Sequence, residues 1–218
     1  MNRLPRLVIF DCDGVLVDSE RITNQVIRDN LARYGLDIEL SRVLDLFVGG
    51  TMQTVMDLAK SMGADLPKSW LDEIYDDIFA ALSEGCTLIP GVPDVLDALD
   101  AAGIPYAVGS NGPHAKMKIT LVKTGLMERL AGRIVSREDV VHPKPAPDVY
   151  LKAAALLDVK PEHCVVIEDS VSGAKAGRAA GMRCFGFAAD TALEKLTPIC
   201  DAIFTEMRQL PELLGLKE

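Results

Sequence analysis

The chain has 218 residues, of which 49% are hydrophobic, 25% charged and 5% aromatic, with a formal net charge of −9. This length suits one large domain, or a domain with a sizeable insertion, and the composition excludes disordered and low-complexity architectures. Because an acidic surface repels phosphate backbones and anionic lipids, we expect no binding to nucleic acid or to a membrane.

The N-terminal sequence and the cysteines indicate the compartment. The apolar run at residues 7–10 is too short for a signal peptide or a membrane span. The five cysteines form no CxxC pair, so neither a zinc site nor a disulfide framework is expected. These features favour a cytoplasmic protein with reduced thiols.

The first predicted element is a strand, and a helical segment follows it. Residues 6–10 form a short apolar run that ends in an acid, which is typical of a buried parallel strand. No strand-like run occurs between Asp18 and Thr87. Helical periodicity in this segment predicts helices over 22–34, 43–47, 51–60 and 67–82. We therefore interpret residues 18–85 as an all-helical domain inserted after the first strand.

After this insertion, strand-like runs alternate with helical patterns. The runs occur at 105–109, 164–167, 183–187 and 202–204. The helical patterns between them cover 92–102, 113–124, 146–157 and 170–180. Such alternation predicts an α/β fold in which a parallel sheet carries helices on both faces. The core domain would comprise residues 1–17 and 86–218.

The first candidate site residues come directly after the first strand. Residues 11–18 read Asp-Cys-Asp-Gly-Val-Leu-Val-Asp. Ligands of open parallel sheets bind at the carboxyl ends of the strands, so Asp11 and Asp13 would face one site. Two carboxylates 4 Å apart repel by about 4 kcal/mol at an effective dielectric constant near 20. The pair needs a cation or a shared proton, unless these are ordinary turn and capping aspartates.

A second acidic pair, Glu168 and Asp169, follows another predicted strand and precedes Ser170, a candidate helix N-cap. Alone, these two acids would be read as capping residues. Together with Asp11 and Asp13 they predict a cluster of carboxylates. Oxygen donors without histidine or cysteine favour magnesium over zinc.

Two further segments are candidates for binding a phosphate. Ser110 and Asn111 follow a strand and precede a helix, where a hydroxyl and backbone N–H groups can hold an anion. The same residues are also ordinary turn formers. Lys144 lies in the proline-rich segment 142–147, which holds its backbone stiff. Its ammonium could offset the carboxylates and hold a phosphate oxygen, although a surface lysine is the alternative.

Four motifs occur in order along the chain: Asp-x-Asp-Gly-x-Leu-x-Asp-Ser-Glu, Ser-Asn-Gly, Lys-Pro-x-Pro and Glu-Asp-Ser-x-x-Gly. They resemble the four motifs of the haloacid dehalogenase superfamily over essentially the whole chain. The helical insertion resembles that superfamily's cap. With this insertion, the chain is similar to the β-phosphoglucomutase-like and phosphoglycolate phosphatase-like branch of the superfamily. Residues 110–117 and 210–213 further resemble bacterial 6-phosphogluconate phosphatases. The resemblance implies a Rossmann-like core with a helical cap.

The resemblance also implies a chemistry, hydrolysis through an aspartyl-phosphate. Asp11 would be the nucleophile. Asp13 would protonate the leaving alkoxide and then activate the water that attacks the intermediate. Ser110, the Asn111 backbone and Lys144 would hold the oxygens of the transferring phosphoryl group.

The same resemblance implies a magnesium site. The ligands would be Asp11, the backbone carbonyl of Asp13, and Asp169, with Glu168 as a further ligand or as a support behind them. The expected cofactor is therefore Mg²⁺.

The cap is expected to choose the leaving group and to close over the site. Residues 48–51 would form a loop that reaches toward the core, which makes Gly49 and Gly50 candidate substrate contacts; alternatively, they only separate two helices. Arg42 is a candidate contact for a sugar phosphate or a carboxylate. Two aspartates, at 76–77, stand where caps of sugar-phosphate enzymes often offer a basic side chain, which weakens the case for 6-phosphogluconate itself.

Other functions share part of this pattern. Dehalogenases of the superfamily lack the second acid, so Asp13 disfavours that reading. The β-phosphoglucomutases share the core residues but carry a histidine where this sequence has Thr23. Receiver-type signalling modules also phosphorylate an aspartate, but they are shorter and have no helical insertion. We predict a magnesium-dependent phosphatase, expected to be a monomer, whose partner is a small phosphorylated metabolite such as a sugar phosphate.

Overall fold

The computed structural model describes residues 4–47, 51–189 and 191–216. The chain forms two compact units, one made of Met1–Val17 and Leu88–Glu218 and the other of Asp18–Thr87. Where the chain crosses from one unit to the other, β2 (Val17–Asp18) and β3 (Thr87–Leu88) form a two-stranded sheet. None of the helices in the described ranges is both long enough and apolar enough to span a membrane.

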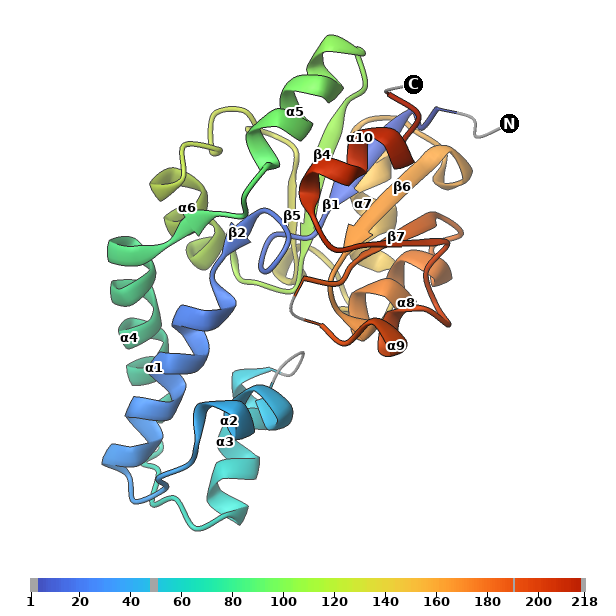
Figure 1. The fold of residues 1–218 in the computed structure, drawn as a ribbon. Coiled ribbons are helices and arrows are strands. Elements are labelled where there is room, and N and C mark those ends of the chain that lie inside the picture. The colour runs from blue at the N-terminus through green and yellow to red at the C-terminus, as the bar shows by residue number, and fades with distance from the viewer. Residues whose placement is uncertain (1–3, 48–50, 190, 217–218) are drawn as a thin grey trace. The chain divides into compact units, whose positions relative to one another are not determined.

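The larger unit is built on a six-stranded sheet with the order β5-β4-β1-β6-β7-β8 (Figure 1). All neighbouring strands are parallel. Their bounds are β1 Leu7–Phe10, β4 Tyr106–Ser110, β5 Ile134–Ser136, β6 Cys164–Glu168, β7 Arg183–Phe187 and β8 Ala202–Phe204. The chain proceeds outward from β1 through β4 and β5, then returns to β6 on the other side of β1. The carboxyl end of β1 is therefore the point at which the strand order reverses, where ligands of such sheets bind.

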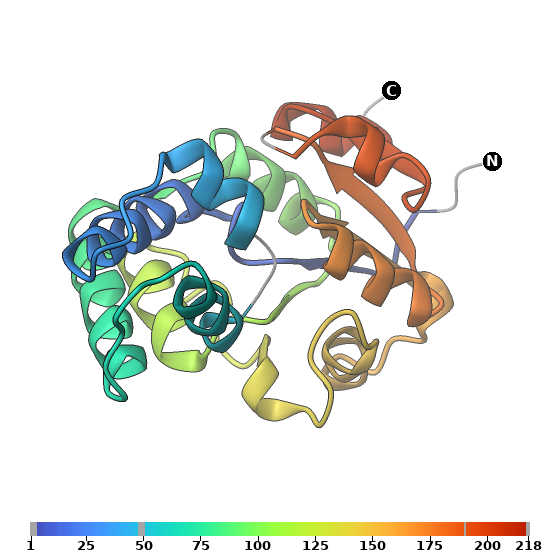
Figure 2. The ribbon, with the colours of Figure 1, turned by 90° about the horizontal axis from the view of Figure 1, so that it is seen from below.

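Helices lie on both faces of this sheet, as the alternation of elements predicted (Figure 2). α7 (Asp148–Leu156) and α8 (Val171–Ala179) share a hydrophobic core with Leu7 and Ile9 of β1. Since side chains alternate along a strand, Val8 and Phe10 point to the opposite face. The remaining helices of this unit are α5 (Val92–Ala101), α6 (His114–Lys123), α9 (Leu193–Leu196) and α10 (Leu210–Leu213).

The sequence predicts five strands in this sheet, and the structure contains β5 in addition. β5 has only three residues, Ile134–Ser136, and pairs with the carboxyl end of β4 at the edge of the sheet. A run of this length is too short for a periodicity to stand out. The strands predicted at 183–187 and 202–204 have the bounds that the structure shows.

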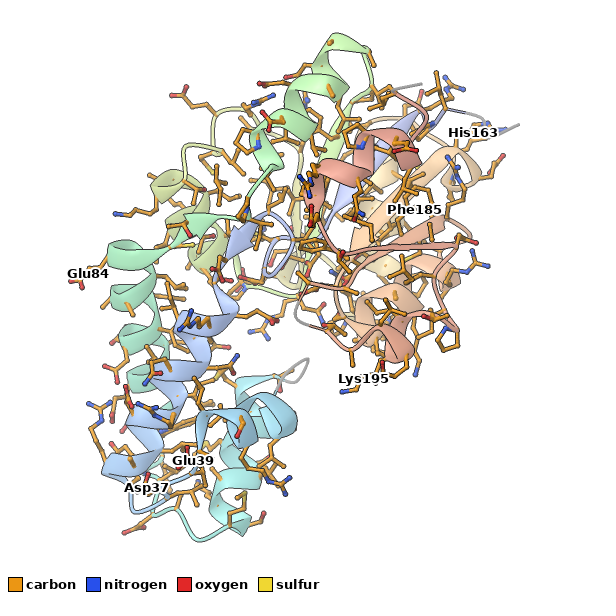
Figure 3. The ribbon with its side chains drawn as sticks, viewed as in Figure 1. Asp37, Glu39, Glu84, His163, Phe185 and Lys195 are labelled. Carbon is orange, nitrogen blue, oxygen red and sulfur yellow. The ribbon has the colours of Figure 1, made fainter. Side chains whose placement is uncertain are left out.

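Between its two strand residues, Asp18 and Thr87, the regular structure of the described part of the smaller unit is helical. Its helices are α1 (Glu20–Arg33), α2 (Leu40–Phe47), α3 (Met52–Ser61) and α4 (Trp70–Gly85). α1 and α4 are joined by a buried polar contact in which the Trp70 indole donates to the Asn30 side chain at 2.7 Å. Thr51 caps α3 by accepting a hydrogen bond from the Thr54 backbone. Acidic side chains such as Asp37, Glu39 and Glu84 are exposed on this unit, consistent with the negative net charge (Figure 3).

Candidate active site

Apart from Lys144, which lies in the loop before α7, the predicted site residues of the larger unit come from the carboxyl ends of three adjacent strands. Asp11 follows β1, and its backbone N–H donates to the Ile167 carbonyl of β6 at 2.9 Å. Ser110 and Glu168 are the last residues of β4 and β6. Since β1 lies between these two strands, its acid meets side chains arriving from both sides.

Lys144 joins two of the acids. Its Nζ donates to Asp11 Oδ1 at 2.8 Å and to Glu168 Oε1 at 2.7 Å, and the residue is 7% exposed. The ammonium also lies over the ring of Tyr150, 4.7 Å from its centroid. Lys144 is thus held inside the site rather than at the surface.

The Asn111 side chain holds the Lys144 loop in place. Its Oδ1 accepts from the Lys144 backbone N–H at 2.9 Å, and its Nδ2 donates to the Lys144 carbonyl at 3.2 Å. Because the amide bonds to both the N–H and the carbonyl of Lys144, it fixes the backbone from which the lysine side chain extends. Asn111 therefore has a positioning role, in addition to the backbone role predicted for it.

Glu168 is fully buried and accepts four hydrogen bonds. Its Oε1 accepts from Lys144 and from the Tyr150 hydroxyl at 2.7 Å. Its Oε2 accepts from the backbone N–H and the hydroxyl of Ser170, both at 2.9 Å. Ser170 also caps α8, as predicted, by accepting from the Gly173 N–H at 3.0 Å. With both oxygens bound by protein donors, Glu168 is placed to support the cluster from behind.

The charges in this cluster shift one another's pKa values. Burial raises the pKa of Asp11 to about 7; Lys144 opposes this shift, whereas Glu168 and Asp13 add to it. Burial acts in the same direction on Glu168, but the ammonium and its hydrogen bonds hold the pKa of Glu168 below its usual value. Burial lowers the pKa of Lys144, yet the two carboxylates outweigh it and the pKa is raised. Since the pKa of Asp11 is raised, a further cation next to its carboxylate would lower that pKa and favour the ionised form.

Asp11, Glu168 and Asp169 form an acidic cluster that could hold a metal ion. One carboxylate oxygen from each lies within 4.8 Å of the others. Asp169 reaches the site because Gly14 has no side chain: a Cβ there would lie 2.0 Å from Asp169 Oδ2, and the φ angle of Gly14 is +74°. The cluster has three carboxylates and one buried ammonium, Lys144, which contacts Asp11 and Glu168. The excess negative charge and the hard oxygen donors fit a divalent cation such as magnesium.

Asp13 lies in the turn after β1 and has a lysine partner that the sequence did not predict. Lys116 Nζ lies 2.8 Å from Asp13 Oδ1. Lys116 is the third residue of α6. A helix dipole disfavours positive charge in the first turn, so a lysine at this position indicated a nearby negative partner.

Tyr150 was also not identified from the sequence. A buried tyrosine hydroxyl requires a hydrogen-bond partner, and this requirement could have pointed to a contact with a site residue.

Ser110 is buried at the end of β4, and its hydroxyl accepts from the Gly112 N–H at 2.9 Å. The following turn is tied to the unpredicted strand β5, because the Ser136 hydroxyl donates to the Gly112 carbonyl at 2.7 Å. A Cβ on Gly112 would lie 3.2 Å from Ser110 Oγ and 3.3 Å from Asp13 Oδ2. The predicted phosphate-binding turn therefore lies beside Asp13.

The predicted substrate contacts of the cap belong to the smaller unit. Arg42 is exposed on α2. Gly49 and Gly50 lie outside the described residues. Asp77, of the aspartate pair noted in the sequence, accepts from Asn30 at 3.0 Å and pairs with Arg33. One acid of that pair therefore stabilises the contact between α1 and α4.

The chain belongs to the haloacid dehalogenase-like hydrolases, because a family model with this description matches residues 5–181. The resemblance drawn from its four motifs is thereby confirmed.

Individual relatives match over 80% or more of the chain. The 6-phosphogluconate phosphatase of Escherichia coli (strain K12) is 32% identical over 215 residues, covering 98% of this chain and 96% of the relative. The fructose-1-phosphate phosphatase YqaB of the same organism is 32% identical over 176 residues, covering 80% and 92%. A crystal structure of a HAD family hydrolase from Deinococcus radiodurans R1, with bound phosphate and sodium, is 35% identical with a TM-score of 0.83 and covers 98% of each chain. These relatives confirm the predicted class of enzyme, a phosphatase of this family.

Proposed function

We propose that this chain is a magnesium-dependent phosphatase that hydrolyses a small sugar phosphate, or a related organic phosphate monoester, through an aspartyl-phosphate. One observation carries the proposal: at the carboxyl ends of β1 and β6, Lys144 bridges Asp11 and Glu168, two members of the acidic cluster that Asp169 completes. A nucleophilic carboxylate, an ammonium for phosphoryl oxygens and a place for a divalent cation are the groups that phosphoryl transfer to a carboxylate requires.

In the first step a carboxylate oxygen of Asp11 forms a bond to phosphorus while the bond from phosphorus to the ester oxygen breaks. The leaving alkoxide takes a proton from Asp13. In the second step Asp13 takes a proton from water, whose oxygen bonds to phosphorus as the Asp11 carboxylate leaves. The products are inorganic phosphate and the alcohol, and both aspartates return to their starting states.

The other site residues hold the transferring group. Lys144 reaches Asp11 Oδ1 at 2.8 Å, so the same ammonium can contact an oxygen of a phosphoryl group on that carboxylate. Ser110 and the backbone of Asn111 precede α6, whose N-terminus favours an anion. Ser110 and the backbone of Asn111 would bind oxygens of the phosphoryl group from the β4 side of Asp11, and Lys144 would bind another from the side of Glu168.

Asp11, Asp169 and the backbone carbonyl of Asp13 would hold Mg²⁺, with Glu168 supporting them through Lys144. When bound, the ion would supply positive charge to the phosphoryl oxygens. The donor set supports this assignment, since it contains hard oxygens and no sulfur or imidazole.

The helical unit, residues 18–85, would act as a cap that chooses the leaving group, and Arg42, Gly49 and Gly50 would contact the substrate. Two relatives, named for 6-phosphogluconate and fructose 1-phosphate, support a sugar phosphate as the substrate class.

The test is phosphate release from a panel of sugar phosphates, with Mg²⁺ and with EDTA. We expect release that requires Mg²⁺ and that Asp11→Asn abolishes while the variant stays folded. Asp37→Asn, an exposed aspartate of the helical unit, serves as the control and should keep full activity. Activity retained in Asp11→Asn would contradict the mechanism. Conversion of glucose 1-phosphate to glucose 6-phosphate with little free phosphate would identify a phosphomutase instead.

A further inference from the structure

Lys116 and Asp13 form an ion pair within the site. The proposed mechanism gives a role to Asp13 but none to Lys116. Lys116 Nζ lies 2.8 Å from Asp13 Oδ1, and the two side chains are only 15% and 19% exposed. Helix N-termini favour negative rather than positive charge, so the first turn of α6 is a costly place for an ammonium. A contact with a carboxylate offsets this cost.

The two oxygens of the Asp13 carboxylate have different surroundings. Oδ1 faces the Lys116 ammonium. Oδ2 lies on the side of the Ser110–Gly112 turn, because a Cβ on Gly112 would come within 3.3 Å of it and 3.2 Å of Ser110 Oγ. Lys116 thus binds one oxygen while the other lies beside the turn expected to bind phosphate.

We propose that Lys116 is a positioning residue for the acid–base chemistry of Asp13, an inference that rests on the proposed function. Its ammonium fixes the carboxylate through Oδ1. With Oδ1 held by the ammonium, Oδ2 is the oxygen that gives the proton to the leaving alkoxide and later takes one from water. Its place beside the turn expected to bind phosphate is what this transfer requires.

This role makes the need for Lys116 depend on the leaving group. A sugar alkoxide is strongly basic and must be protonated as it leaves. p-Nitrophenolate is stable as an anion and leaves without a proton. A lysine that only bound the phosphate, or only stabilised the fold, would affect both esters alike.

The experiment compares kcat/KM for fructose 1-phosphate and p-nitrophenyl phosphate in the wild type and in Lys116→Met, both with Mg²⁺. General acid–base catalysis contributes about 10²- to 10⁴-fold, so we expect Lys116→Met to lower kcat/KM for the sugar phosphate by roughly 10- to 100-fold. For p-nitrophenyl phosphate the loss should stay below about 3-fold, since the acid is not needed. Lys116→Arg should restore part of the loss.

Lys118→Met is the matched control, since Lys118 is an exposed lysine of the same helix and its loss removes the same charge. It should leave the ratio of the two kcat/KM values unchanged. In an Asp13→Asn background, Lys116→Met should produce no further leaving-group effect, because its partner carboxylate is gone.

Equal losses for the two esters in Lys116→Met, or no loss, would overturn the inference and leave the phosphatase function standing. A wild type that releases phosphate from neither ester would instead overturn the proposed function. If Lys116→Met does not fold, Lys116→Gln replaces it, with the same expected ratio.

Discussion

Two lysines contact aspartates of the same turn, and they differ in how far each is buried. The Lys144 side chain is 3% exposed and is shared between Asp11 and a fully buried Glu168. The Lys116 side chain is 15% exposed and contacts Asp13, which is 19% exposed. Breaking a buried ion pair leaves an uncompensated charge away from water, whereas a partly exposed pair can be replaced by water. We therefore expect replacement of Lys144 to lower the stability of the fold far more than replacement of Lys116.

Replacing Lys144 should have the largest effect. Lys144→Met leaves Asp11 and Glu168 without their ammonium, and we expect the free energy of unfolding to fall by about 3–5 kcal/mol. Lys116→Met, the matched variant, should cost about 1–2 kcal/mol, between the values for exposed and for buried ion pairs. Urea denaturation of both variants in EDTA measures the difference. Similar losses for the two lysines would refute the distinction.

Tyr150→Phe should have the next largest effect. It removes the hydroxyl that donates to Glu168 at 2.7 Å while keeping the ring under the Lys144 ammonium. A hydrogen bond to a buried charge contributes about 1.5–3 kcal/mol, so a loss of that order is expected in urea denaturation. A loss below 0.5 kcal/mol, taken as about the scatter of surface substitutions, would mean that Lys144 and Ser170 suffice to hold Glu168.

Gly173→Ala tests how closely α8 approaches the Glu168 carboxylate. A Cβ at Gly173 would lie 1.6 Å from Glu168 Oε1, so Glu168 must move. We expect a loss of about 1–3 kcal/mol, together with reduced activity because Lys144 would lose its position. Gly85→Ala is the control: its Cβ would meet only the Ile22 side chain, at 3.4 Å, and stability should be kept. Equal stability of the two variants would contradict the assigned packing.

The last prediction concerns Asp11, and it is a slope of stability with pH rather than a single loss. Its pKa is raised from 3.8 to about 7, mainly by burial, so in this range the folded state binds more protons than the unfolded state. Stability in EDTA should therefore fall as the pH rises from 4 to 7, by at most about 1.4 kcal/mol per pH unit from this group. Asp11→Asn should lack this component. A wild type and variant whose stabilities run parallel over this range would contradict the raised pKa.

The acids of the site could be predicted because their positions depend on local sequence. Asp11 and Glu168 each end an apolar run, and parallel strands bring such ends to one edge of a sheet. The contact between Lys116 and Asp13 could not be predicted in this way. It joins a helix to a turn far away in the chain, and only the packed structure determines which oxygen the ammonium reaches.

Strand prediction was likewise complete for the centre of the sheet but not for its edge. The central strands are buried and apolar, so their sequence pattern is strong. β5 is short and lies at the edge, and its place depends on pairing with β4 rather than on its own residues. This short strand is linked to the candidate site, because the Ser136 hydroxyl donates to the carbonyl of Gly112, in the turn that lies beside Asp13.

The two hydrogen bonds between the Asn111 side chain and the Lys144 backbone have a consequence for protein engineering. They make two loops, separated by more than thirty residues in sequence, into one structural module. Grafting the lysine loop onto another scaffold of this fold without the asparagine would transfer the residues but not their alignment. Exchange of catalytic loops between relatives should succeed only when both segments are transplanted together.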